Sequence, residues 1–190
     1  MSIVLASGSP RRRELLGMLG VEDFVICPAV GEEKADMSLP PDEIVCALSA
    51  AKAAEVAEKF GAEDVIIAAD TIVWCGGKIF GKPRTKADAE DMLNSLSGGE
   101  HEVYTGITVI KGETKISEAE CTKVRFRVLD SAEIAAYIAS GEPMDKAGAY
   151  GIQGKASLFA EGIEGDFFNV MGLPLCRLGQ MLKTIGVRLL

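Results

Sequence analysis

The stretch Asp64-Val65-Ile66-Ile67-Ala68-Ala69-Asp70 decides the fold. Its continuous apolar run is typical of a strand buried on both faces, and such strands occur in sheets that carry helices on each side. Toward the N-terminus, Ile3 to Ala6 predicts a short strand, and Pro41 to Phe60 predicts a long helix between the two. Because strands and helices alternate, the sequence predicts an α/β protein with a mixed twisted sheet flanked by helices.

Hairpins and shorter helices are expected after the central run, which delivers Asp70 at its end. Gly76-Gly77 stands between Thr71 to Cys75 and Lys78 to Phe80, which predicts a tight hairpin. The other expected elements are a helix from Pro10 to Leu19 with Ser9 as its cap, a strand over Phe24 to Cys27, a helix from the Thr85 and Asp88 capping box to Leu96, strands over His101 to Ile110 and Ala119 to Val128, a helix from Asp130 to Gly141, strands over Ser157 to Ala160 and Phe167 to Val170, and a helix after Pro174.

Length and charge exclude several classes of protein. The 190 residues predict one domain, residues 1–190, with no linker or repeat. The net charge of -8 argues against a protein that binds nucleic acid or an anionic membrane surface by bulk charge. No apolar stretch approaches the roughly 18 residues of a membrane span. The first residues do not resemble a secretory signal, so we expect a cytoplasmic protein.

The cysteines and the single histidine give little support to a metal or redox site. Five cysteines are widely spaced without a Cys-x-x-Cys pair, so we expect reduced and mostly buried thiols. His101 is the only histidine, which excludes a site with several histidine ligands. We expect its side chain to face solvent at the start of a strand.

Two features point to a bound anion and to a functional carboxylate. Arg11, Arg12 and Arg13 occupy the first turn of a predicted helix, where cations oppose the helix dipole but can join free amide groups in binding phosphate. A solvated basic turn is the alternative. Asp70 ends a buried strand, where ligands of open α/β sheets gather, unless it only caps the following turn.

Weaker signals lie in other loops and in the long helix. Glu32 and Glu33 are adjacent acids in a loop, and Lys52 falls at a spacing that indicates an inward direction without settling it. Gly81 and Pro83 fix the backbone around Lys82, which is otherwise an ordinary exposed lysine. Glycines around Gln153 let the backbone approach a flat ligand or form a plain turn. Together these residues suit a polyphosphate with a divalent metal.

The order of short motifs resembles the Maf family from about residue 3 to residue 180. The motifs are Leu5-Ala6-Ser7-Gly8-Ser9-Pro10-Arg11-Arg12, Ala69-Asp70-Thr71, Gly81-Lys82-Pro83, Ser97-Gly98, Tyr104-Thr105-Gly106, Gly141-Glu142-Pro143, Asp145-Lys146-Ala147-Gly148-Ala149-Tyr150-Gly151-Ile152-Gln153-Gly154 and Asn169-Val170-Met171-Gly172-Leu173-Pro174. The resemblance implies a nucleoside triphosphate pyrophosphatase that uses Mg²⁺ or Mn²⁺. It also implies two lobes with a central cleft, similar to the inosine triphosphate pyrophosphatases.

The resemblance also implies a substrate and roles for individual residues. Asp70-Thr71 and Gly151-Ile152-Gln153-Gly154 resemble the branch that acts on dTTP and UTP. Asp70 would be the proton acceptor and, with Glu33 or its neighbour Glu32, would hold the metal. The resemblance also implies that Ser9, Arg12, Lys52 and Lys82 hold the phosphates. Base preference would be set by Arg12, Thr71 and Gln153.

Chemistry supports these roles and leaves alternatives open. Hydrolysis needs a water in line with the bond from the α-phosphorus to its bridging oxygen, and an ordinary aspartate is too weak to activate water without a metal. The amide of Gln153 can both accept from and donate to the edge of thymine or uracil. The alternatives are the same reaction on another triphosphate, such as 7-methyl-GTP or CTP, and a nucleotide-binding regulator of septum formation. The expected partner is a small nucleotide, and a homodimer is one candidate assembly.

Overall fold

The computed structural model describes residues 1–21, 23–31 and 36–190. The strands are β1 (Ile3–Leu5), β2 (Phe24–Ile26), β3 (Val65–Cys75), β4 (Lys78–Phe80), β5 (Glu100–Lys111), β6 (Thr114–Phe126) and β7 (Ala160–Glu164). The α-helices are α1 (Pro10–Met18), α2 (Pro41–Ala57), α3 (Lys86–Leu96), α4 (Ser131–Ala139), α5 (Phe167–Met171) and α6 (Leu175–Thr184). The 3₁₀ helices are η1 (Glu142–Asp145), η2 (Ala147–Ala149) and η3 (Gly154–Leu158).

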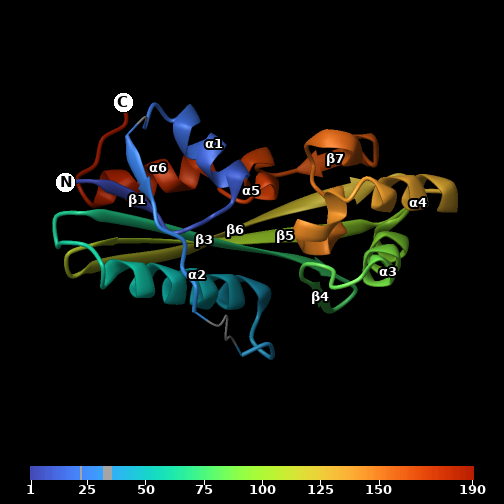
Figure 1. Ribbon diagram of the computed structural model, residues 1–190, viewed down its shortest axis with the longest axis horizontal. Helices are drawn as coiled ribbons and strands as arrows, with labels where there is room; N and C mark the ends of the chain where they lie inside the picture. The colour runs from blue at the N-terminus through green and yellow to red at the C-terminus, as the bar shows by residue number, and fades with distance from the viewer. Residues whose placement is uncertain (22, 32–35) are drawn as a thin grey trace. The chain divides into compact units, whose positions relative to one another are not determined.

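The described strands form one mixed sheet (Figure 1). Their order is β2-β1-β3-β5-β6-β7, and β4 pairs with β3. Strand β1 pairs in parallel with β2 and β3, whereas β3 with β4 and β6 with β7 are antiparallel. The predicted mixed α/β class is therefore confirmed. No helix in the described ranges is both long and apolar enough to cross a membrane.

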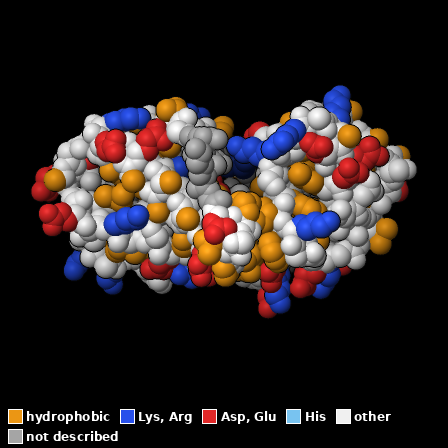
Figure 2. Space-filling view, turned by 90° about the horizontal axis from the view of Figure 1, so that it is seen from below, with side chains coloured by type: hydrophobic (Ala, Val, Ile, Leu, Met, Phe, Trp, Pro, Cys, Tyr) orange, Lys and Arg blue, Asp and Glu red, His pale blue; other side chains and the backbone are white. Residues whose placement is uncertain are grey.

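The chain divides into two compact units, and each is built from separate segments. Unit 1 contains residues 1–70, 105–120 and 172–190, and unit 2 contains residues 71–104 and 121–171. Strands β3, β5 and β6 therefore contribute residues to both units. On the face of each unit seen in Figure 2, acidic side chains stand beside Lys and Arg side chains.

In unit 1, helices cover both faces of the sheet. Side chains of α2 pack against alternate residues of β1 and β3 in one buried cluster: Val4, Ala6, Ala53, Val56, Ile66 and Ala68. Successive strand residues point to opposite faces, so the fully buried Leu5 and Ile67 face the other side. Figure 1 shows α1 and α6 on that side. The central strand is thus buried on both faces, as its apolar run predicts.

Helix α2 approaches β5 closely at Gly106. A Cβ atom at this position would lie 2.2 Å from the carbonyl oxygen of Val45 and 2.7 Å from the amide nitrogen of Cys46. Both are backbone atoms of the helix, so no side-chain rotation can make room. The glycine therefore allows the helix and the strand to touch through their backbones.

In unit 2, α3 packs against α4, and both helices begin with the side-chain cap that the sequence predicts. Thr85 and Asp88 form a reciprocal capping box at α3, and Asp130 and Glu133 form one at α4. These pairs satisfy amide groups that no intrahelical carbonyl reaches, which fixes where each helix starts.

Several sequence predictions are wrong in detail. Strand β3 continues through Asp70 to Cys75, so Asp70 lies within a strand rather than at its end. Of residues 157–160, only 157 and 158 lie in η3 and 160 begins β7, and the predicted strand over residues 167–170 is the helix α5. The Asp166 side chain accepts a hydrogen bond from the amide of Phe168 at 2.7 Å and so caps the first turn of α5. Val128, the last residue of the strand predicted from Ala119, follows the end of β6 and is 78% exposed.

Two further predictions on single residue types are also wrong. His101 is only 2% exposed instead of facing solvent, because its ring packs edge-on against Phe126 and Tyr150. The cysteines are free thiols, as expected, but four are half-buried and Cys176 is exposed. Of the five, Cys27 packs against the buried cluster of unit 1 as a partly buried residue.

Candidate functional site

Asp70 and Lys52 form the central ion pair of the candidate site in unit 1. Asp70, on β3, is 8% exposed. Its Oδ1 atom accepts a hydrogen bond from the Nζ of Lys52 on α2, which makes the two side chains an ion pair. The lysine side chain is 17% exposed. The helix that covers the central strand therefore also supplies the counterion for its carboxylate. This contact settles the open question of Lys52, whose side chain points inward.

The start of α1 supplies a fixed cation in unit 1. The Nε of Arg12 donates to the carbonyl oxygen of Gly172 at 2.7 Å, and its Nη1 donates to the Oγ of Ser7 at 3.3 Å. The same Ser7 oxygen accepts from the amide of Ser9 at 3.3 Å. Ser9 occupies the N-cap position, but its hydroxyl makes no side-chain cap. The predicted cap of Ser9 at the start of α1 is therefore not formed by its side chain.

Helix α2 also holds the loop that leads to the predicted acids. The two carboxylate oxygens of Glu55 accept from the amides of Val30 and Gly31, each at 3.0 Å. These hydrogen bonds lower the pKa of Glu55 and keep it ionised. Glu32 and Glu33, the predicted metal and water partners, lie outside the described residues. Sequence reasoning missed Glu55 because its i,i+4 spacing with Lys59 suggested only a surface pair.

The remaining predicted residues belong to unit 2. Thr71 is half-buried in β3, Lys82 is exposed after β4, and Gln153 is half-buried between η2 and η3. The amide of Gly148 donates to the carbonyl oxygen of Gly81 at 3.1 Å. The segments that carry Lys82 and Gln153 are thus joined directly within this unit.

The loop that carries Gln153 has an unusual backbone. Ala149 has a φ of 59°, a left-handed value that costs energy in a residue other than glycine. At Gly148, whose φ is 68°, a Cβ atom would lie 2.8 Å from the side chain of Val73. The glycine at this position is therefore required for space as well as for backbone conformation.

The described residues test whether a divalent metal suits this site. They contain no group of three His, Cys, Asp or Glu side chains that would form a complete metal cage. Mg²⁺ is commonly held by one or two carboxylates together with substrate phosphates, and Asp70 offers one such carboxylate. The chemistry of the described donors therefore fits a metal that arrives with a polyphosphate.

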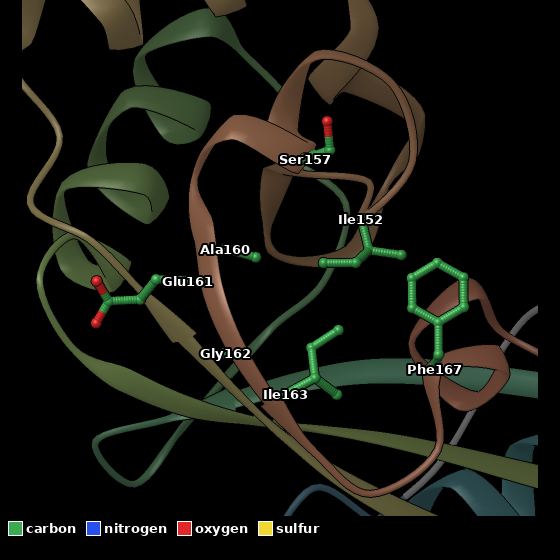
Figure 3. Close-up of a pocket in the computed structure, with 7 residues that line it drawn as sticks. All are labelled: Ile152, Ser157, Ala160, Glu161, Gly162, Ile163 and Phe167. Carbon is green, nitrogen blue, oxygen red and sulfur yellow. The ribbon is translucent and has the colours of Figure 1, made fainter.

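A separate pocket lies in unit 2 beside the same loop (Figure 3). Its volume is about 360 Å³, and it is lined by Ile152, Ser157, Ala160, Glu161, Gly162, Ile163 and Phe167. Figure 3 shows the side chains of Ile152, Ile163 and Phe167 pointing toward one another, while the carboxylate of Glu161 points away. With apolar side chains converging and no lining cation, this pocket does not suit a triphosphate.

Comparison with known proteins places the chain among nucleotide enzymes. The sequence model of the Maf family, described as Maf-like protein, matches residues 2–185. The chain is 48% identical over 185 residues to a dTTP/UTP pyrophosphatase of Bacillus anthracis, covering 97% of this chain and 96% of that one. A dTTP/UTP pyrophosphatase of Bacillus cereus is 47% identical over the same shares.

A solved structure from Mycobacterium abscessus, titled nucleoside-triphosphatase / dITP/XTP pyrophosphatase, has a TM-score of 0.43 and 13% identity, covering 69% of this chain and 76% of that chain. The family match spans nearly the whole sequence, and the relatives align along almost their entire length. The predicted resemblance is confirmed: the chain belongs to the Maf family.

Proposed function

We propose that this protein is a nucleoside triphosphate pyrophosphatase that hydrolyses dTTP and UTP to the monophosphate and pyrophosphate. The observation that carries the proposal is the buried Asp70 on the central strand, paired with Lys52, in a chain so similar to dTTP/UTP pyrophosphatases. Burial of a carboxylate costs desolvation free energy unless the group is paired, so a buried carboxylate often has a function. Here the proposed function is proton transfer by Asp70 and charge neutralisation by Lys52 next to a polyphosphate.

In the proposed reaction, a water oxygen attacks the α-phosphorus. The bond from that phosphorus to the oxygen bridging to the β-phosphorus breaks, and pyrophosphate leaves with the electron pair. Asp70 accepts the proton of the water. Lys52 is paired with this carboxylate before substrate binds and offers positive charge to the phosphates.

The phosphates are proposed to bind to cations that the chain holds in place. Arg12 is fixed by Gly172 and Ser7, so its guanidinium loses little freedom on binding an anion. Ser9 and Lys82 complete the proposed phosphate-binding set. A divalent metal, Mg²⁺ or Mn²⁺, would be held by Asp70 and Glu33 and would supply charge neutralisation and acidification of the water.

Base selection is proposed to rest on Gln153, with Thr71 and Arg12. The amide oxygen of Gln153 would accept the ring N–H of thymine or uracil, and its NH₂ group would donate to a ring carbonyl. Cytosine presents the opposite order of donor and acceptor. Rejection of CTP therefore requires that the amide be held in one orientation.

Two coarser properties extend the proposal. We propose that residues 1–190 act as one domain, because neither unit is a continuous segment of the chain. We also propose a cytoplasmic location, which suits five free thiols and a nucleotide substrate. A homodimer stays a prediction.

The test is a panel of natural and modified nucleoside triphosphates with Mg²⁺ or Mn²⁺, with products resolved by chromatography. We expect monophosphate and pyrophosphate, formed fastest from dTTP and UTP. Asp70→Asn should abolish hydrolysis while nucleotide still binds, and the exposed Asp42→Asn on α2 serves as the matched control. If 7-methyl-GTP or CTP is hydrolysed fastest, the reaction stands but the proposed substrate is wrong. If the folded protein binds nucleotides and hydrolyses none of them, the result favours a nucleotide-binding regulator.

A further inference from the structure

One carboxylate in unit 2 reaches the loop of Gln153 from both sides. The Oε2 atom of Glu142 accepts from the amide of Lys155 at 3.4 Å. Its Oε1 atom accepts from the hydroxyl of Tyr137 at 3.2 Å, and that hydroxyl accepts from the amide of Gly151 at 3.3 Å. The backbone is thus tied two residues before Gln153 and two residues after it.

The loop lies directly against this carboxylate. Gly154 has a φ of 73°, and a Cβ atom there would lie 2.7 Å from the Oε1 atom of Glu142. A side chain at this position would displace the carboxylate from both of its partners. The glycine of the motif therefore has a physical role, which is to let Glu142 reach the loop.

The directions of these hydrogen bonds are consistent with one another. Burial raises the pKa of Tyr137, so its hydroxyl keeps the proton that it donates to Glu142. The same oxygen is left with lone pairs for the amide of Gly151. A carboxylate only accepts, and both of its oxygens meet donors here. An amide in its place would turn one of these acceptors into a donor.

A second contact holds the other end of the same loop. The hydroxyl of Tyr150 and the Nε2 atom of His101 lie 2.8 Å apart in a hydrogen bond between buried groups. Tyr150 follows Ala149, the residue with the left-handed backbone. Such a conformation persists only where its surroundings hold it. The loop is therefore fixed from Ala149 through Lys155.

We propose that Glu142, through Tyr137, is a positioning residue that sets the orientation of Gln153 and thereby the preference for thymine and uracil over cytosine. The inference rests on the proposed role of Gln153 in reading the base. A backbone fixed on both sides holds the Cα and Cβ atoms of Gln153, and so sets the position and direction from which its amide meets the base. When the backbone is released, that placement is lost and the amide can also meet cytosine, so discrimination falls while the phosphate chemistry persists.

The test measures kcat and KM for dTTP, UTP and CTP in Glu142→Ala, Glu142→Gln and Tyr137→Phe. Glu142→Ala should lower the ratio of kcat/KM for dTTP to that for CTP by on the order of tenfold, because it removes the hydrogen bond to the amide of Lys155 and the one that holds the hydroxyl of Tyr137 beside the loop. The change should appear mainly in KM. Glu142→Gln should recover part of the ratio. Tyr137→Phe removes the hydroxyl that links Glu142 to the amide of Gly151 but leaves the hydrogen bond from Lys155 to Glu142, so its ratio should lie between those of Glu142→Ala and the parent. Glu161→Ala, which removes a surface partner of Arg125 in the same unit, should leave the ratio unchanged.

Three results would overturn the inference. An unchanged ratio in Glu142→Ala, with a lowered ratio in Gln153→Ala, would reject Glu142 as a positioning residue and leave the proposed function intact. An unchanged ratio in Gln153→Ala would reject the base-reading role, and the role of Glu142 would fall with it. An equal loss of kcat for all three nucleotides would assign Glu142 a purely structural role. If Glu142→Ala does not fold, Tyr137→Phe decides by the same ratio.

Discussion

Replacement of Gly106 by alanine tests the close approach of α2 to β5. The added Cβ atom would stand 2.2 Å from the carbonyl oxygen of Val45, which is 1.2 Å short of the 3.4 Å at which ordinary contact begins. Its nearest neighbours are helix backbone atoms, so relief requires a shift of α2 itself. Overpacking in a core typically costs about 1–3 kcal/mol, and we expect the upper end, about 3 kcal/mol, because no flexible side chain can yield.

The assay is urea unfolding of Gly106→Ala beside a matched glycine replacement in the same unit. Gly179 lies inside α6 with no atom within 4 Å of its added Cβ, so Gly179→Ala should stabilise unit 1 by about 0.5–1 kcal/mol. Gly106→Ala should also lower turnover, because the helix that must move carries Lys52. A free energy of unfolding within about 0.5 kcal/mol of the parent would refute the close approach.

Three further predictions concern ionisable side chains. Hydrogen bonds from Arg127, with one from the Asp130 amide, lower the pKa of Glu133 from 4.5 to about 2, so the stability that they contribute is present above pH 4.5 and lost as the pH falls toward 2. Urea unfolding of Glu133→Gln and the parent should converge over that range, and a constant gap would contradict this. Burial lowers the pKa of His101 from 6.5 to about 4, so the fold loses stability as the pH falls between these values. In His101→Phe, the Tm should therefore depend less on pH over this range than in the parent. An unchanged slope of Tm against pH would contradict this. Lys52→Met should lower kcat/KM by about 10²–10³-fold in steady-state kinetics, since it removes a charge placed for the phosphates; a near-normal rate would exclude that role.

Local signals in the sequence were sufficient for the burial of the central strand and for the starts of α3 and α4. The apolar run from Val65 to Ala69 predicts a strand buried on both faces because each face must meet a helix. The capping pairs Thr85 with Asp88 and Asp130 with Glu133 depend only on residues three apart, so they are visible in the sequence. Membership of the Maf family followed from motifs in which the order of residues is specific.

Contacts between distant segments explain what the sequence did not predict. The segment 167–170, expected as a strand, is a helix whose Asn169 side-chain amide donates to the carbonyl oxygen of Val103 and to the hydroxyl of Thr122, contacts that a local pattern cannot reveal. The burial of His101 had a weak signal, since it falls in the same alternation as the buried Val103 and Thr105. Glu142 was part of a motif, but nothing local shows that its carboxylate ties residues 151 and 155.

The division of the chain into segments has a consequence for synthesis on the ribosome. Unit 2 is complete once residue 171 has emerged, whereas unit 1 waits for its last segment, residues 172–190. That segment holds α6, whose buried apolar residues are Leu175, Leu178, Met181 and Leu182. The unit that contains the N-terminus therefore finishes last, and nascent chains stopped before α6 expose an apolar face of unit 1 to chaperones and proteases.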